Sequence, residues 1–269
     1  MAFSINGNTA AASAYSSLLK TTNSTQQAQE ELASGNSVNN PSDNTSAYRV
    51  SSELQTQISE MTSANSNISE AQNLLSTGET ALSSVNDLLT QIQGTISAAT
   101  DPTADLSSLA GDINSLGNEI SAIFTNTDFN ATALLSGSSL PTGGNFVFQT
   151  GPSESTTINF GNLATLSLAS ISGSGATAAN ITSLSVTSLQ TAVQNALGSI
   201  GDYEQRMTVK SNYLTAAISN AQSTISSLTG ANVAQDQMKS TQGQIAEQIS
   251  TTMLSQLNSA PQNLLKLFQ

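Results

Sequence analysis

Apolar residues recur every seven positions between residues 42 and 99, and no other feature of the sequence constrains the fold as strongly. The series consists of Leu54, Met61, Ile68, Leu75, Leu82, Leu89 and Ile96, with Ile58, Val85 and Ile92 between its members. A seven-residue apolar repeat is typical of a helix that packs against other helices. We predict one helix of roughly 85 Å, at 1.5 Å per residue. Its two glycines, Gly78 and Gly94, are the positions at which it could be interrupted.

The composition suits thin layers of helices better than a thick globular core. Of the 269 residues, 37% are hydrophobic, 9% are charged and 4% are aromatic, with no tryptophan. Small polar residues make up most of the rest. A surface of this kind can meet another copy of the chain without a large cost for desolvating charges.

The ionisable residues exclude several classes of function. The net charge is −12, and the six basic residues form no patch, so we expect no binding to nucleic acid or to an anionic membrane. The chain has no cysteine and no histidine, which removes thiol chemistry, the commonest metal ligand and the commonest general base. We therefore expect no enzyme activity, no metal and no cofactor. The N-terminus does not look like a signal peptide, and no apolar run of about 18 residues predicts a membrane-spanning helix.

Further helices are expected on both sides of the long one. A weakly amphipathic helix covers residues 1–33, and Ser42 or Asp43 caps the long helix. A second helix, 102–124, begins after Asp101 as its cap. A helix over 188–229 is followed by Gly230 as a C-cap or hinge and by a last helix that Pro261 ends. The apolar face of that last helix consists of Met238, Ile245, Ile249, Met253, Leu254 and Leu257.

The middle of the chain changes character. Residues 145–149 and 156–160 alternate in polarity and flank a short polar turn, which predicts a β-hairpin. Residues 161–183 are rich in alanine, serine and glycine and could form short strands or irregular structure. The fold class is therefore mainly α, a long antiparallel helical rod with a small β-hairpin region and with paired termini.

Two discontinuous domains follow from this order. Residues 1–41 pair with 231–269, and residues 42–230 form a helical rod whose hairpin lies around 143–162. The residues expected to pack the rod are Leu82, Val85, Leu89, Ile92, Ile96, Ile113, Leu116, Ile120, Leu197, Ile200, Leu214 and Ile225.

Several short motifs resemble those of bacterial flagellins. They are Ile5–Asn8 (INGN), Leu32–Asp43 (LASGNSVNNPSD), Asn126–Asn130 (NTDFN) followed by Leu134 and Leu135, Gly201–Met207 (GDYEQRM) and Ala260–Phe268 (APQNLLKLF). The resemblance covers about 1–150 and 188–269 and leaves no room for the large outer domains of the family. Two features depart from the pattern: Ser37 stands where a basic residue is usual, and the segment 230–237 holds only one acidic residue, Asp236. The stretch 39–43 also resembles the hook–filament junction proteins, which remain the alternative.

The resemblance implies a structural subunit that self-assembles into the extracellular flagellar filament. It also implies export in an unfolded state by the flagellar type III route. The implied partners are other copies of the chain, the cap protein, the hook–filament junction protein and an export chaperone at the C-terminal region. The resemblance implies that the terminal helices form the core of the filament. Helices with so few apolar residues also need neighbours to offset their ordering entropy. The residues expected to make these contacts are Phe3, Ile5, Leu18, Leu19, Ile249, Met253, Leu257, Leu264, Leu265 and Leu267.

Three narrower readings accompany the resemblance. The stretch Leu89–Ile96 corresponds to the one that a Toll-like receptor binds in many flagellins. It carries Gln91, Gln93, Gly94 and Thr95 where recognised members have arginines and a Glu-Leu pair. Glutamine has neither the charge nor the donor fork of arginine, so weak or absent activation is expected. Serines and threonines of 136–185 either carry O-linked sugars or stay unmodified. An adhesin or secreted effector with a coiled-coil rod is a further alternative, although the chain has no sequence repeat beyond the helical period.

Overall fold

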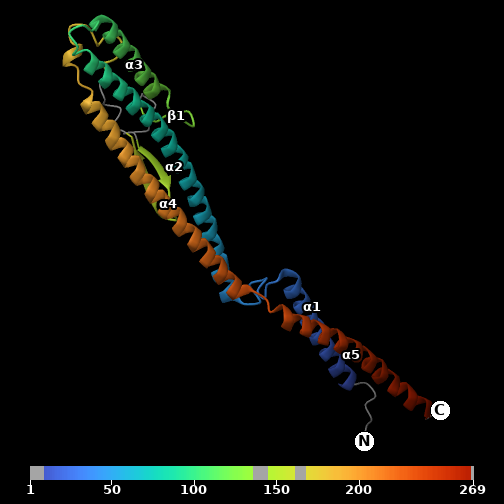
Figure 1. The fold of residues 1–269 in the computed structure, drawn as a ribbon. Helices are drawn as coiled ribbons and strands as arrows, with labels where there is room; N and C mark the ends of the chain where they lie inside the picture. The colour runs from blue at the N-terminus through green and yellow to red at the C-terminus, as the bar shows by residue number, and fades with distance from the viewer. Residues whose placement is uncertain (1–8, 136–144, 161–167, 268–269) are drawn as a thin grey trace. The chain divides into compact units, whose positions relative to one another are not determined.

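The computed structural model describes residues 9–135, 145–160 and 168–267, the last ten of these and Ala10 by their backbone only. The helices are α1 (Thr9–Ser34), α2 (Thr45–Ala98), α3 (Leu106–Asn126), α4 (Thr187–Thr229) and α5 (Val233–Leu267), with a 3₁₀ turn, η2 (Ile181–Ser183). Among the described residues between α3 and η2 lie two antiparallel hairpins: β1 (Asp128–Phe129) with β2 (Thr132–Ala133), and β3 (Asn145–Gln149) with β4 (Ser155–Asn159) (Figure 1). The predicted fold class, mainly α with a small antiparallel hairpin, is confirmed.

The chain forms two compact units. One consists of residues 1–56 and 220–269, and the other of residues 57–219. These limits lie within α2 and α4, whereas the sequence places the domain limits after residues 41 and 230. None of the described helices is long and apolar enough to span a membrane.

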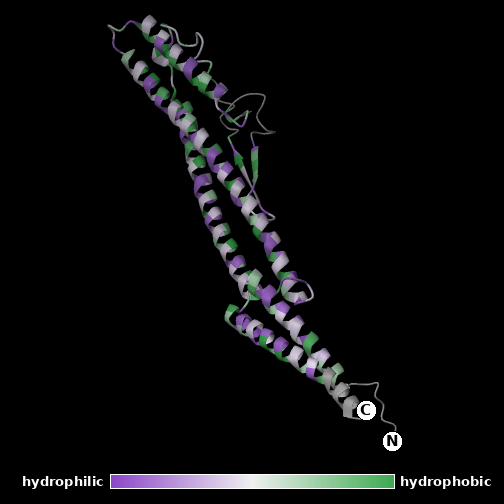
Figure 2. Cartoon of the chain, turned by 90° about the vertical axis from the view of Figure 1, so that its right-hand side faces the viewer, coloured by the Kyte–Doolittle hydropathy of each residue, from purple (hydrophilic) through white to green (hydrophobic). Residues whose placement is uncertain are grey.

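The core of unit 57–219 follows the heptad stripe of α2. Ile68, Leu75, Leu82, Leu89 and Ile92 are all buried. Polar contacts tie α2 to α4, where the Ser211 hydroxyl donates to Asn65 Oδ1 at 2.7 Å. Hydrophobic residues recur along each helix rather than gathering at one end (Figure 2). Burial of this continuous stripe explains why a helix of 54 residues is stable despite its many serines and threonines.

Gly78 does not interrupt α2, and its missing side chain makes room for Phe160, which follows β4, and for Ile200 of α4. A Cβ atom at this position would lie 2.9 Å from a ring carbon of Phe160 and 3.6 Å from Cδ1 of Ile200. The Phe160 ring in turn packs edge-on against Phe146, with ring centroids 6.0 Å apart. Gly94 has open space around it and also stays helical.

Helix α3 supports the chain segment at 171–176. The amide of Asn114 bonds both the N–H and the C=O of Ala176, at 2.9 and 2.8 Å. Asn118 accepts a hydrogen bond from the N–H of Gly173 at 2.8 Å. Between them, Gly117 is buried beneath the backbone of Ile171, and a Cβ there would overlap the Ile171 carbonyl. The absence of a side chain at Gly117 therefore allows backbone to lie directly on the helix.

Helices α1 and α5 pair in an antiparallel manner in unit 1–56 with 220–269. Asn36 and Gly230 form an antiparallel bridge. Ser37 N–H donates to Thr229 O at 2.6 Å, and Ala231 N–H donates to Gly35 O at 3.0 Å. These bonds join the ends of α1 and α4 to each other, and they set the register in which α5 returns along α1.

Two helix caps differ from those predicted. The carboxylate of Asp43 accepts the N–H groups of Asn39 and Asn40, so the following residue, Asn44, caps α2 by accepting from Ala47 N–H at 3.0 Å. Asp101 likewise accepts from the hydroxyl and the N–H of Thr103, and these bonds lower its pKa below the ordinary value. Because Asp101 is engaged in this turn, α3 begins four residues further on.

The cap of α3 is Asp105, which accepts from the N–H groups of Ser107 and Ser108. The prediction that Pro261 ends the last helix is wrong, since α5 continues to Leu267. A proline within a helix removes one N–H donor and disturbs the preceding turn. Helical backbone on both sides can persist, as it does here.

Candidate interaction surfaces

Large apolar side chains lie on the outside of the α1–α5 pair. Val233, Met238, Ile245, Ile249 and Met253 of α5 are each 54 to 59% exposed. The last four follow one another at spacings of seven, four and four residues, so they share one side of the helix. On α1, Tyr15 and Leu19 are also exposed. Contiguous apolar surface of this kind is typical of interaction sites.

Small and polar residues, by contrast, form the inside of the same pair. Thr25, Ala28 and Glu31 of α1 are buried, as are Asp236 and Ser240 of α5. Gln27 donates to the buried Glu31 carboxylate at 2.9 Å, and Lys239 donates to that of Asp236 at 3.0 Å. The pair is thus inverted relative to an ordinary amphipathic helix pair, in which the large apolar residues face inward.

Close approach of the two helices depends on Gly243. A Cβ atom at this position would overlap the hydroxyl of Thr25, whose own hydrogen bond goes to Thr21 O at 2.8 Å. Leu254 and Leu257 on the inner side of α5 are half-buried. The face predicted for the last helix is therefore two faces. Its two leucines lie on the inner one, and its four isoleucines and methionines lie on the outer one.

The surface hydroxyls of the long helices are largely satisfied within their own helix. Along α2, Thr56, Thr62, Thr77, Thr80, Ser84, Thr90 and Thr95 each donate to the carbonyl four residues earlier, at 2.7 to 3.1 Å. Such back-bonding leaves no hydroxyl donor that must be paired again when the surface is covered. A surface of this kind can be buried against a neighbour at little cost.

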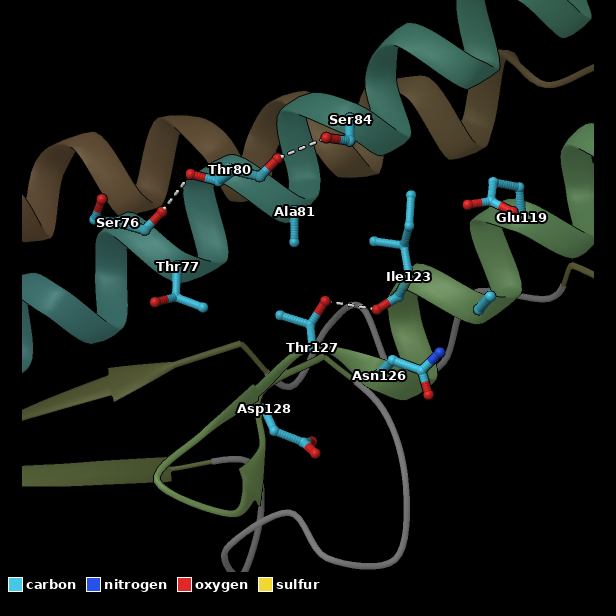
Figure 3. A pocket seen from close by; sticks show the side chains of 11 residues that line it. Ser76, Thr77, Thr80, Ala81, Ser84, Glu119, Ile123, Asn126, Thr127 and Asp128 are labelled. Carbon is cyan, nitrogen blue, oxygen red and sulfur yellow. Dashed lines mark hydrogen bonds between the residues drawn. The ribbon is translucent and has the colours of Figure 1, made fainter.

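A groove runs between α2 and α3. One section of 610 Å³ is lined on α2 by residues from Ser76 to Ser84 and on the other wall by Glu119, Ile123, Thr127 and Asp128. Figure 3 shows Ala81 and Ile123 on opposite walls of this section. A second section of 600 Å³ lies further along the same two helices, between Gln91–Ala98 and Leu109–Leu116. Three members of the predicted receptor-like stretch, Gln91, Gly94 and Thr95, line this second section, and Gln93 is half-buried outside it.

The residues predicted to pack the rod lie mostly inside unit 57–219. Leu82, Val85, Leu89, Ile92, Ile96, Ile113, Ile120, Ile200 and Leu214 are buried, and Leu116 and Leu197 are half-buried. Ile225, also half-buried, belongs to the other unit.

Of the residues predicted for the filament core, Leu19, Ile249 and Met253 are exposed, whereas Leu18 and Leu257 are half-buried. The side chains of Leu264, Leu265 and Leu267 lie outside the described part, as do Phe3 and Ile5. The sequence did not single out Tyr15 and Val233 as contacts. Only their exposure in the structure identifies them.

Little in the described part of the chain resembles a catalytic site. No group of acidic side chains there is arranged to hold a metal ion. Apart from Asp101, one carboxyl group in this part has a shifted pKa: desolvation and the nearby charge of Glu79 raise the pKa of Glu204 above its ordinary value. Glu204 lies on α4 and lines neither section of the groove. Its raised pKa therefore reflects burial and repulsion from Glu79 of α2.

The comparison with known families rests on both ends of the chain. Residues 5–139 match the family described as the bacterial flagellin N-terminal helical region, and residues 184–268 match the bacterial flagellin C-terminal helical region. The chain belongs to the bacterial flagellin family. Comparison with curated proteins gives no significant match. The predicted recognition is confirmed, and the two matched regions are the parts that contain α1 to α3 and α4 to α5.

Flagellins are structural proteins of the extracellular filament, and they polymerise with copies of themselves. In this flagellin, only residues 140–183 separate the matched regions. They hold β3, β4 and η2.

Proposed function

We propose that this flagellin assembles into the flagellar filament through the outer face of its α1–α5 pair. The observation that carries the proposal is the inverted burial of that pair. The face with the large apolar side chains is the exposed one. Covering a half-exposed isoleucine or methionine removes apolar surface from water at about 25 cal/mol per Å², and four such residues of α5 share one side. We propose that other copies of the chain cover this apolar face.

The domain roles follow from the same proposal. Residues 1–41 and 231–269 form the filament core, and residues 42–230 form the surrounding layer. The inner face of the α1–α5 pair is too polar to stabilise two isolated helices, so their ordering is coupled to association. This coupling suits a subunit that leaves the cell unfolded by the type III route and folds where it is added.

The remaining partners are also proposals. The cap protein and the hook–filament junction protein meet the chain at the two ends of the polymer, and an export chaperone covers the C-terminal region before export. A chaperone that masked Met238, Ile245, Ile249 and Met253 would prevent premature association. The alternative, a junction protein, requires a chain that caps a filament instead of elongating it.

Seeded elongation of the full chain tests the proposal. We expect Ile249→Asp to stay monomeric at concentrations at which the unchanged chain elongates, because a carboxylate would be buried in an apolar contact. Gln248→Asp is the matched control, since it adds the same charge at the next position, which is exposed and polar. Elongation of the Ile249→Asp chain at the rate of the control would refute the proposed interface. A wild-type chain that binds filament ends without elongating them would favour the junction protein.

We also propose that this flagellin activates the Toll-like receptor weakly or not at all. Gln91 and Gln93 offer no guanidinium to the receptor, and Gly94 offers no side chain. A receptor reporter assay on monomers should give little signal. Signalling as strong as that of a recognised flagellin would contradict the proposal.

A further inference from the structure

The charge of unit 57–219 restricts how two copies of it can touch. This segment contains twelve acidic residues and only two basic ones, Arg206 and Lys210. Like charges brought together across an interface cost free energy and reject a wrong pairing. A contact between two such units is therefore favoured only where a cation of one meets the carboxylates of the other.

Arg206 is the cation that is available for such a contact. Lys210 already forms an ion pair with Glu154 of the hairpin. Within the described part of the chain, no carboxylate pairs with Arg206, whose guanidinium lies 5.7 Å from the centre of the Tyr203 ring. The Arg206 side chain is on the exposed side of α4.

Two large side chains share that side of α4 with Arg206. Val209 and Tyr213 are 63% and 71% exposed, and they follow Arg206 by three and seven residues. Positions with this spacing lie on one face of a helix, which is the pattern of a helix that docks in a groove. The outer face of α4 thus offers one cation and two apolar anchors.

The groove between α2 and α3 has the complementary character. In the section of Figure 3, Glu119 and Asp128 stand on the same wall, on either side of Ile123 and Thr127. Both carboxylates are exposed. Ala81 and Ile123 supply apolar surface between the two walls. No lysine or arginine lines either section of the groove.

We propose that the groove between α2 and α3 of one copy receives the outer face of α4 of a second copy. Arg206 would lie between Glu119 and Asp128, and Val209 and Tyr213 would cover the apolar floor. This inference rests on the proposed self-assembly and identifies a second contact in it, separate from the α1–α5 face. The two surfaces are different patches of one unit, so the contact is heterologous. A heterologous contact repeats from copy to copy and generates rings or open helical polymers instead of closed dimers.

Charge reversal and its rescue test this contact in the full chain. The variants are Arg206→Glu, Glu119→Lys and the double variant that carries both. Short seeds sheared from wild-type filaments are elongated with each chain, and the critical concentration is measured by sedimentation. We expect each single reversal to raise the critical concentration about tenfold or more, since like charges at a contact cost several kcal/mol. The double variant should return towards the wild-type value when it elongates its own filaments.

Gln205→Glu is the matched control, because it adds negative charge at the neighbouring exposed position of α4 and should change the critical concentration little. Circular dichroism of the monomers shows whether each variant folds, and Arg206→Gln is the milder change if Arg206→Glu does not. Wild-type elongation by Arg206→Glu, or failure of the double variant to regain elongation, would overturn the contact. These outcomes leave the proposed function intact when the wild-type chain elongates. A wild-type chain that never elongates would instead contradict the proposed function itself.

Discussion

Gly117 and Gly111 lie on the same helix, α3, and the structure predicts opposite effects for the same substitution at each. A Cβ at Gly117 would overlap the carbonyl of Ile171 and come within 3.0 Å of the Ser172 nitrogen. These are backbone atoms, which cannot rotate out of the way. A Cβ at Gly111 would meet no atom within 4 Å. Gly117→Ala must therefore lift the 171–176 segment from α3, whereas Gly111→Ala only improves helix propensity.

The contacts that Gly117→Ala would weaken give the size of the expected change in the free energy of unfolding. Three hydrogen bonds link Asn114 and Asn118 to the segment, each contributing about 1 kcal/mol. Ile171 is fully buried, and burying such a side chain contributes about 1.5 to 3 kcal/mol. The gain from replacing glycine by alanine in a helix offsets about 1 kcal/mol. Because the segment shifts without detaching fully, we expect a net loss of about 2 to 3 kcal/mol, against a gain of up to about 1 kcal/mol for Gly111→Ala.

Hydrogen exchange is the appropriate assay, since the chain has two compact units and one unfolding midpoint would average them. The amides of Gly173 and Ala176 report directly on the segment, because both donate to α3 side chains. They should exchange much faster in Gly117→Ala and at an unchanged or slower rate in Gly111→Ala. Equal protection of both amides in the two variants would refute the argument that Gly117 is required for this packing.

Three further predictions concern other parts of the chain. Glu204→Gln should stabilise unit 57–219 at pH 7 but not at pH 4. The raised pKa of Glu204 means that its charged form is disfavoured in the folded state. The stability of the unchanged chain is therefore greatest below the unfolded pKa of Glu204 and falls as the pH rises through the folded pKa. A difference in denaturation midpoint between Glu204→Gln and the unchanged chain that is equal at both pH values would contradict this. Ala131→Gly should stabilise the β1–β2 turn by up to about 1 kcal/mol, since Ala131 has a φ of +59°; a loss of stability in urea unfolding would show that the methyl group makes a needed contact. Gly243→Val should separate α1 from α5, because its side chain would overlap Thr25; unchanged amide exchange in α1 would argue against that close packing.

The predictions from sequence succeeded where the pattern is local and repetitive. The heptads of α2 and α4 predict those helices to within about three residues, because every turn repeats the same apolar position. The alternation of 145–149 and 156–160 predicts the β3–β4 hairpin for the same reason. The β1–β2 hairpin was missed because two-residue strands contain no period to detect.

The predictions failed where neighbouring residues compete for one role. Ser42, Asp43 and Asn44 can all cap a helix, and only the turn at 39–43 decides that the Asp43 carboxylate is used elsewhere. Gly117 gave no signal, because its role depends on a backbone segment that lies more than fifty residues away in the sequence. The outer face of α5 was predicted only in part, since the sequence shows which residues are apolar but not which side of the helix α1 covers.

The bridge between Asn36 and Gly230 makes the α1–α5 pair depend on residues that are far apart in the sequence. The Ser37 and Thr229 partners are 192 positions apart, and bringing such distant positions together costs about 5 kcal/mol of loop-closure entropy in a flexible chain. Packing of α5 on α1 contributes to offsetting this cost. A prematurely terminated product can form much of unit 57–219, but α1 then lacks its counterpart. Only a chain that contains α5 presents the inverted pair, so copies that lack this helix are excluded from a polymer built on that surface.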